Sequence, residues 1–312
     1  MTAAVLGAGP AVAAERDVAG GGSAGAGGTG KPTVVLVHGA FADASGWNRV
    51  AERLMRDGYD VIAPANPLRS LTGDSAYIAS VLKSIDGPIV LVGHSYGGAV
   101  ISGAAAGNPN VKALVFVSAF MPDKGETLGA LAATFPGSEL QPALNSVPYS
   151  DGTTEGTDLY IKTDRFHSVF AADLPVSTTR LMAVGQRPIS GATFEEKAGP
   201  AAWKTIPSWF VVAKNDKAIA PDLERFEAKR ARSRTVEVDS SHAAMMSHPE
   251  VVTRTIRQAA DATASGAARA TSLSESGARK LALAGAGGLA GAAVLTGSAL
   301  VFAGSRWRAP RR

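Results

Sequence analysis

The chain has 312 residues, 46% of them hydrophobic, which is enough for one large domain with a sizeable core and two tails. It has no cysteine, and this excludes a disulfide framework, cysteine metal sites and a thiol nucleophile. The net charge is +4, but residues 32–262 carry 22 Lys and Arg against 24 Asp and Glu. The positive excess therefore belongs to the ends of the chain, and no nucleic-acid-binding face is expected on the domain.

The first 31 residues are informative mainly through their composition. Residues 1–14 are for the most part Ala, Val, Leu and Gly, and Ala11-Val12-Ala13 is similar to a signal-peptide cleavage site. No Lys or Arg precedes this stretch, so it is interpreted either as a truncated export signal or as a disordered leader. Residues 19–30 contain seven glycines in twelve positions, a composition typical of a flexible linker.

Residues 32–262 alternate between short apolar runs and amphipathic segments. The first run, Thr33 to Val37, is rich in β-branched residues and too short for a helix, which is typical of a strand buried on both faces of a sheet. Strands are expected at 33–37, 59–63, 89–92, 111–118, 208–213 and 235–238, and helices at 46–57, 74–85, 99–106, 221–231 and 249–262. This alternation predicts an α/β fold with a doubly wound, mostly parallel sheet, whose ligand sites lie at the C-terminal ends of the strands.

The alternation stops between about residues 121 and 206. This stretch has Gly- and Pro-rich turns, a helix-like patch at 125–134, a polar segment at 150–158, and helices expected within 164–172 and 176–184. It lies between two expected strands of the sheet. It is therefore predicted to be an inserted cap over the active-site end of the sheet.

The expected strand at 89–92 leads into Gly93-His-Ser-Tyr-Gly97 and then into a helix of small residues. Glycines at positions 93 and 97 remove the Cβ atoms that would collide in so sharp a turn, and the turn would present Ser95 at its apex. The pattern G-x-S-x-G in this context predicts a nucleophile elbow. A serine hydroxyl is a weak nucleophile near neutral pH, so it needs a base, an acid that orients the base, and N–H donors for the oxyanion.

Five histidines are candidates for the base. His242 is favoured because it follows the last expected strand, where its loop would overhang the elbow. His94 is the second residue of the elbow pattern, so its side chain should point away from the nucleophile, and His38 is expected to shape the loop after the first strand. His248 is interpreted as a helix-start residue and His167 as a lining residue of the cap.

The acid should follow another strand and lie between the serine and the final histidine in sequence. Asp216 meets this condition, and Asp123 is the reserve candidate. One oxyanion N–H should come from the residue after the nucleophile, which is Tyr96. The second should come from the loop after the first strand, where Ala40 is favoured over Phe41.

Four short motifs resemble those of the α/β-hydrolase superfamily: V-V-L-V-H-G-A-F at 34–41, G-H-S-Y-G-G at 93–98, K-N-D at 214–216 and S-H at 241–242. The first two are similar to those of bacterial carboxylesterase-like relatives of the plant methyl-ester esterase and hydroxynitrile lyase group. In the plant lyases a lysine directly follows the triad histidine, whereas this chain has Ala243. Ester hydrolysis is therefore favoured over cyanohydrin cleavage.

The resemblance implies a serine hydrolase that cleaves a small carboxylic ester through an acyl-enzyme and needs no cofactor. Ser95 would be the nucleophile, His242 the base and Asp216 the acid that orients it. No metal is implied, because no cluster of His, Asp and Glu has ligand spacing. Two alternatives stay open: another triad enzyme on the same fold, such as a hydroxynitrile lyase, perhydrolase, lactonase or amidase, and a non-catalytic surface binding module.

After residue 262 the composition shifts to Ala, Ser, Gly and Thr, which predicts a flexible spacer at 263–280. Residues 281–303 carry no charge and are about long enough to cross a bilayer, and four arginines in the tail 304–312 favour a cytoplasmic C-terminus. Leu273-Ser-Glu-Ser-Gly277 resembles a degenerate cell-wall sorting signal, so sortase processing is an alternative to a retained membrane anchor. Both interpretations predict a domain outside the cytoplasm, attached to the cell membrane or the cell wall. A soluble Ala- and Gly-rich helix or a disordered tail is the remaining alternative.

Overall fold

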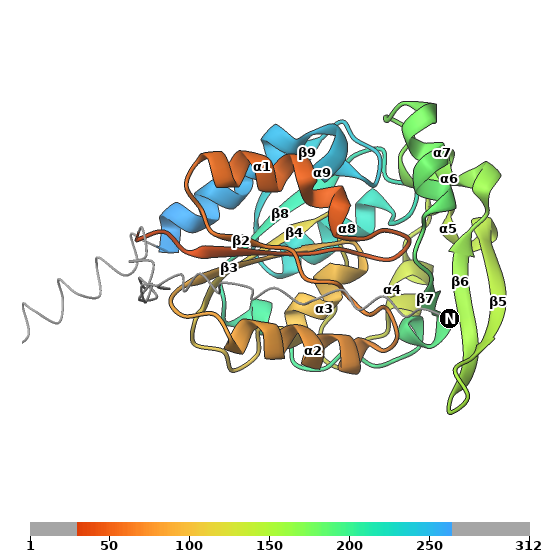
Figure 1. Cartoon of the computed structure of the whole chain (residues 1–312), viewed down its shortest axis with the longest axis horizontal. Coiled ribbons are helices and arrows are strands. Elements are labelled where there is room, and N and C mark those ends of the chain that lie inside the picture. The colour runs from red at the N-terminus through yellow and green to blue at the C-terminus, as the bar shows by residue number, and fades with distance from the viewer. Residues whose placement is uncertain (1–29, 264–312) are drawn as a thin grey trace, which may run out of the picture. The chain divides into compact units, whose positions relative to one another are not determined.

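The computed structural model describes residues 30–263 (Figure 1). The predictions of a leader, a hydrophobic segment at 281–303 and a basic tail at 304–312 lie outside the described residues, as do the sorting motif and the spacer apart from residue 263. Within residues 30–263, no helix combines the length and the apolar character that a bilayer crossing requires.

A six-stranded sheet with the order β2-β1-β3-β4-β8-β9 forms the centre of the domain, and all of its pairings are parallel. Its strands are β1 (Thr33–Val37), β2 (Val61–Ile62), β3 (Ile89–His94), β4 (Val111–Val117), β8 (Ser208–Ala213) and β9 (Arg234–Val238). The inner strands are continuous apolar runs because helices cover both faces of a parallel sheet. The prediction of a doubly wound, mostly parallel α/β sheet is confirmed.

The side chains of each strand alternate between two hydrophobic cores. Val34 and Leu36 of β1 belong to one core together with α1 and the helical residues 249–263. Val35 and Val37 belong to the other core together with α2, α3 and α8. Figure 1 shows α1 on one face of the sheet and α2 and α3 on the opposite face. The labelled helices outside residues 121–206 are η1 (Ala44–Trp47), α1 (Asn48–Arg56), α2 (Leu71–Lys83), α3 (Tyr96–Ala104), α8 (Pro221–Arg230) and α9 (Ala244–Ser247).

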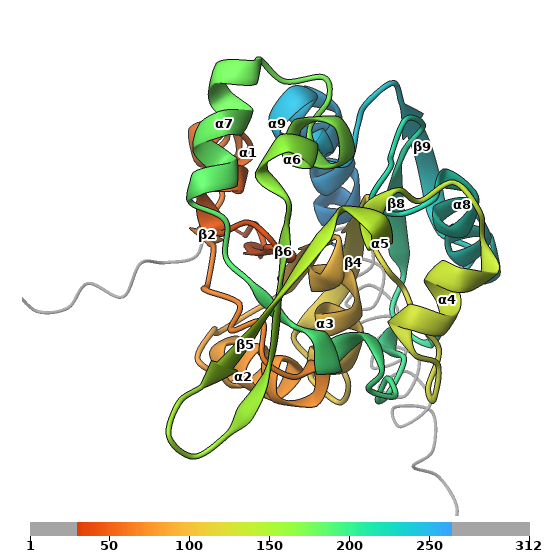
Figure 2. The same ribbon diagram turned by 90° about the vertical axis from the view of Figure 1, so that its right-hand side faces the viewer.

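The segment 121–206, named the cap segment here, lies between β4 and β8 and contains a second sheet with the antiparallel order β5-β6-β7. Figure 1 shows it at one end of the central sheet, and Figure 2 looks onto it with β5 and β6 crossing in front. Helices occur where the sequence predicts them, but the β5–β6 hairpin was missed. The elements are α4 (Leu128–Thr134), α5 (Leu140–Ala143), β5 (Leu144–Ser150), β6 (Glu155–Ile161), α6 (Thr163–Phe170), α7 (Val176–Val184), β7 (Ile189–Ser190), η2 (Gly191–Phe194) and η3 (Ala202–Lys204).

Helix α8 buries a carboxyl group, that of Glu227, whose Oε1 accepts the N–H of Met121 at 2.9 Å and lies 3.6 Å from the guanidinium of Arg230. Burial raises the pKa of Glu227 to about 8, from the usual value near 4.5. The folded protein therefore keeps a proton that the unfolded chain releases as the pH rises above about 4.5. The free energy of unfolding consequently falls between about pH 4.5 and pH 8.

Replacing Glu227 with Gln should remove this decrease in the free energy of unfolding, because the amide oxygen still accepts the N–H of Met121 and the amide cannot ionise. At pH 7 the variant is expected to be more stable than the parent by roughly 3 kcal/mol, and at pH 4.5 by much less. Urea unfolding at the two pH values measures the difference. Glu52→Gln is the control, because Glu52 is an exposed residue of α1. A gain in stability that is equal at both pH values would contradict the prediction.

Candidate active site

The turn between β3 and α3 presents Ser95, with His94 the last residue of the strand and Tyr96 the first residue of the helix. Ser95 has φ +55° and ψ −127°, a conformation that costs energy for any residue with a Cβ and that is found at functional turns. A Cβ at Gly93 would lie 2.6 Å from the carbonyl oxygen of Gly97, so the turn can close only with glycine there. The local sequence thus holds a serine in the geometry that the elbow pattern predicts.

Asp216 and His242 meet at the same end of the sheet, Asp216 after β8 and His242 after β9. The Nδ1–H of His242 donates to Oδ2 of Asp216 at 2.6 Å, and both side chains are buried. The other carboxylate oxygen, Oδ1, accepts the N–H groups of Ala218 at 2.7 Å and Ile219 at 2.9 Å. Backbone donors therefore orient the carboxylate, and the carboxylate orients the imidazole, leaving Nε2 of His242 as the nitrogen that could take a proton.

His94 joins the elbow to the loop that carries His242. Its Nε2–H donates to the carbonyl oxygen of His242 at 3.0 Å, and the centroids of the two imidazole rings are 4.6 Å apart. Burial lowers the pKa of His94 well below its usual value, so the ring is neutral. Among residues 30–263 the Ser95 hydroxyl makes no hydrogen bond to His242, a contact that in free enzymes often tightens only when substrate binds.

His38 shapes the loop after β1, as expected. Its Nδ1–H donates to the carbonyl oxygen of Gly39 at 2.9 Å, and its Nε2 accepts the N–H of Asn66 at 2.9 Å. The ring is buried, and burial lowers the pKa of His38, which keeps it in the neutral form that these two contacts require. Gly39 lies directly against Ser95, so this loop sits beside the elbow.

The loop offers one N–H for an oxyanion. The N–H of Phe41 donates to the carbonyl oxygen of Arg187 at 3.1 Å and is therefore engaged. For Ala40, no hydrogen-bond acceptor is found within the described part of the chain. Tyr96 is the first residue of α3, where an N–H has no partner inside the helix. The structure thus leaves the two donors that the sequence analysis preferred available beside Ser95.

The other candidates lie elsewhere. Asp123, the reserve acid, pairs with Lys204 at 2.6 Å and not with His242. His167 contacts Thr179 Oγ1 at 3.1 Å within the cap segment, and His248 lies 3.5 Å from Glu250. Within residues 30–263, no group of three or more His, Asp or Glu side chains is arranged to hold a metal ion.

The sequence analysis missed Glu224, a buried residue of α8 behind Asp216. Its Oε2 accepts the N–H of Ala213 at 3.1 Å, at the end of the strand that leads to Asp216. Burial and the adjacent charge of Asp216 raise the pKa of Glu224 well above its usual value. The sequence signal for it is weak, because acidic residues at i and i+3 of a helix usually face solvent.

A cavity of about 440 Å³ lies beside the site, under α4 and α5. Two of its lining residues touch the candidate triad: the N–H of Phe120 donates to the carbonyl oxygen of Ser95 at 3.2 Å, and Ala218 contacts Asp216 as described above. Most of the other walls are apolar, and one carboxylate lines the cavity. The larger lining side chains are Phe120, Phe135, Leu140, Gln141, Leu159, Phe194 and Glu195.

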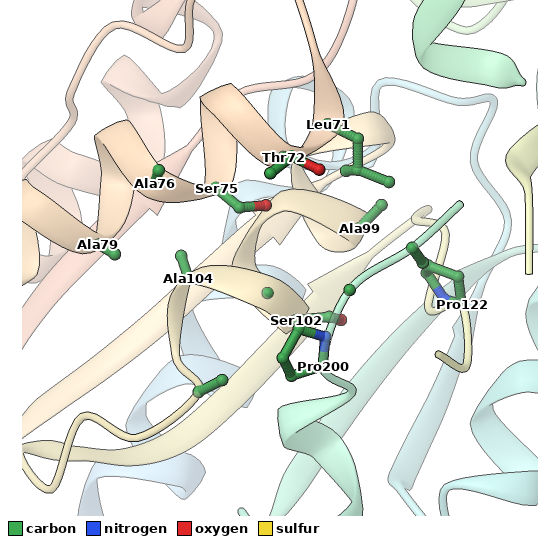
Figure 3. A pocket seen from close by; sticks show the side chains of 14 residues that line it. Leu71, Thr72, Ser75, Ala76, Ala79, Ala99, Ser102, Ala104, Pro122 and Pro200 are labelled. Carbon is green, nitrogen blue, oxygen red and sulfur yellow. The ribbon is translucent and has the colours of Figure 1, made fainter. Parts of the chain in front are cut away.

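A second hollow, of about 230 Å³, is shown in Figure 3 and lies between α2 and α3. Its lining side chains are small or aliphatic, with Pro122 and Pro200 closing one side. The hydroxyls of Thr72, Ser75 and Ser102 are its only polar side-chain groups in the described chain. It therefore contains no acid–base pair that could activate a nucleophile.

The chain is similar to known alpha/beta hydrolases in sequence and in fold. The model of the alpha/beta hydrolase family matches residues 34–255. An alpha/beta hydrolase of Aspergillus novofumigatus is 26% identical over 254 residues, which cover 74% of this chain and 97% of that protein. Methylesterase 2 of Arabidopsis thaliana is 28% identical over 218 residues, which cover 63% of this chain and 82% of that protein. The crystal structure of polyneuridine aldehyde esterase matches with a TM-score of 0.64 at 21% identity and covers 73% of this chain and 98% of that one.

Proposed function

Because the chain belongs to the alpha/beta hydrolase family and is a carboxylesterase-type hydrolase, we propose that it cleaves a small carboxylic ester through Ser95, His242 and Asp216. The observation that carries this proposal is the 2.6 Å hydrogen bond between His242 Nδ1 and Asp216 Oδ2. It is made by two buried side chains at the strand ends, beside a strained turn that presents a serine. This arrangement engages Nδ1 of His242 and leaves Nε2 as the nitrogen that would accept the seryl proton.

In the proposed reaction, Ser95 Oγ attacks the ester carbonyl carbon while His242 Nε2 takes the hydroxyl proton. The negative charge that forms on the carbonyl oxygen is stabilised by the N–H groups of Ala40 and Tyr96. His242 then gives its proton to the departing alkoxide, and the alcohol leaves an acyl group on Ser95. Water, deprotonated by His242, attacks this acyl group and regenerates the free serine. Asp216 stays ionised and stabilises the imidazolium in both steps.

A fluorophosphonate probe tests the assignment directly, because it phosphonylates only a serine whose proton is removed by a base. The expected result is one adduct on the intact chain, located on Ser95 by peptide mass spectrometry, together with hydrolysis of p-nitrophenyl butyrate. A chain that hydrolyses no ester and takes up no label would favour the non-catalytic binding module. A panel that adds a cyanohydrin, a lactone and an anilide separates ester hydrolysis from the other triad chemistries.

The acyl group of the substrate is proposed to occupy the 440 Å³ cavity. Two of its lining residues support this: the N–H of Phe120 donates to the carbonyl oxygen of Ser95, and the N–H of Ala218 donates to Oδ1 of Asp216. An apolar cavity binds a neutral group well and a charged one poorly, because a carboxylate would lose its hydration there. Glu195, which also lines the cavity, adds repulsion for anions. The proposed substrates are therefore esters of neutral aliphatic or aromatic acids.

A matched pair of esters checks this preference. The kcat/KM of p-nitrophenyl hexanoate is expected to exceed that of the p-nitrophenyl monoester of adipic acid by about tenfold or more, since the two acyl chains have the same length and differ in charge. Glu195→Gln should narrow the ratio by removing the repulsion between carboxylates. Glu155→Gln is the control, because Glu155 is an exposed residue at the start of β6. Equal rates for the two esters would show that the acyl chain does not enter this cavity.

A further inference from the structure

The loop that carries His242 is held from outside the central domain by one carboxylate of the cap segment, that of Asp173. This residue lies in the connection between α6 and α7. Its Oδ2 accepts the N–H of Ser241 at 3.1 Å and the hydroxyl of Ser240 at 3.0 Å, and its Oδ1 accepts the hydroxyl of Ser241. All of these donors come from the two residues directly before His242.

The serines themselves are buried and form a small network. Ser240 is fully buried and Ser241 nearly so, and the hydroxyls of Ser240 and Ser247 lie 2.9 Å apart. Their buried donors therefore need acceptors inside the protein. Asp173 accepts the hydroxyls of Ser240 and Ser241 and the N–H of Ser241, and the N–H of Ser240 donates to the carbonyl oxygen of Val238. Burial alone would raise the pKa of Asp173, but the hydrogen bonds from Ser241, Ser247 and Ser240 outweigh it and lower this pKa. The carboxylate is thus ionised at neutral pH and makes charge-assisted hydrogen bonds.

Phe170, the last residue of α6, packs against the imidazole of His242. The ring centroid of Phe170 lies 5.0 Å from that of His242 and 6.1 Å from that of His94, with edge-to-face geometry in both pairs. The cap segment therefore fixes the main chain before His242 through Asp173 and the side of its ring through Phe170. His94 in turn donates to the carbonyl oxygen of His242.

We infer that Asp173 is a positioning residue for the proposed esterase reaction: by binding Ser240 and Ser241, it holds His242 in line between Asp216 and Ser95. The inference rests on the proposed function, in which His242 is the base. Under this inference the cap segment has two roles: it positions the base, and it forms a wall of the proposed substrate cavity. A misplacement of the base by about 1 Å can cost on the order of 100-fold in rate, so the effect on turnover should be large compared with the effect on binding.

The test compares Asp173→Asn, Ser241→Ala and the double variant, using the full chain and p-nitrophenyl butyrate. An asparagine presents an NH₂ group to one of the three donors that the carboxylate now accepts, so the network cannot be completed. Asp173→Asn is expected to lower kcat, per active site titrated with the fluorophosphonate, by about tenfold or more, with KM changed less than about twofold. The double variant should be no slower than the slower single variant, because both changes break the same contact.

Asp164→Asn is the matched control, the same substitution at an exposed position in the first turn of α6. It should leave both kcat and KM unchanged. Titrating active sites separates a slower enzyme from a smaller folded fraction, and Ser241→Ala gives the same readout if Asp173→Asn does not fold. An unchanged kcat in Asp173→Asn, or multiplicative losses in the double variant, would overturn the inference while leaving the esterase assignment intact. A parent chain without esterase activity would instead refute the proposed function, and the inference with it.

Discussion

Replacing Ser95 with alanine is expected to lower kcat/KM for p-nitrophenyl butyrate by at least about 1,000-fold. The chain has no cysteine, and the hydroxyl of Ser95, at the elbow between β3 and α3, is the proposed nucleophile. Alanine keeps the Cβ and fits the same backbone conformation, and Ser95 Oγ makes no hydrogen bond in the described structure that the change would break. Initial rates measure the loss, and thermal unfolding followed by circular dichroism should show a midpoint within a few degrees of the parent's.

The control for this variant is Ser102→Ala. Ser102 is another buried serine of α3, and its hydroxyl donates to the carbonyl oxygen of Gly98 at 2.9 Å, away from His242. It should retain full activity and full labelling by the fluorophosphonate. An Ser95→Ala variant that still hydrolyses the ester at the parent's rate would mean that the nucleophile lies elsewhere.

Gly39→Ala is expected to reduce kcat by about 100- to 1,000-fold, the loss typical of a damaged oxyanion hole. A Cβ at this position would lie 2.6 Å from the Cβ of Ser95 and 2.8 Å from the carbonyl oxygen of His94. Neither neighbour is the end of a flexible side chain, so the loop must move away from the elbow. The N–H of Ala40 moves with it and no longer reaches the oxygen that it would stabilise.

Gly199→Ala serves as the control, because a Cβ there would meet nothing within 4 Å. It should have the parent's activity and stability. Rates per titrated active site distinguish a damaged site from partial unfolding of Gly39→Ala. A variant with the parent's kcat per titrated site would show that the loop at 38–41 does not contribute to the transition state.

The fold and the main site candidates could be predicted because their signals are local. Strands β1, β3, β4 and β8 are continuous apolar runs, and parallel strands buried on both faces have this appearance. The elbow is a pattern of five adjacent residues. The choice of Asp216 and His242 as candidates rests on their positions after strands, because the C-terminal ends of parallel strands converge at one edge of a sheet. The family comparisons confirm the expected fold and the ester-hydrolase class.

The features that the sequence analysis did not predict depend on contacts between residues that are distant in the sequence. Helix α2 was expected to begin at 74 but begins at Leu71, because Ser70 caps it and the carboxylate of Glu196 accepts the N–H groups of Leu71 and Thr72. The β5–β6 hairpin was missed because β5 is mostly exposed, β6 is mostly half-buried, and neither strand has a clear apolar alternation. Asp173 is an ordinary loop aspartate until the fold brings it to Ser241.

Strands β4 and β8 are hydrogen-bonded neighbours, although the whole cap segment separates them in the chain. The entropy of closing a loop grows only with the logarithm of its length, so the pairing of these two strands depends weakly on how many residues intervene. The cap segment, which lines most of the proposed acyl cavity, can therefore be lengthened, shortened or exchanged for another while the strand order is preserved. Such exchange is a physical route by which new substrate ranges evolve on one scaffold, provided that each replacement supplies an acceptor for the two serines before the base.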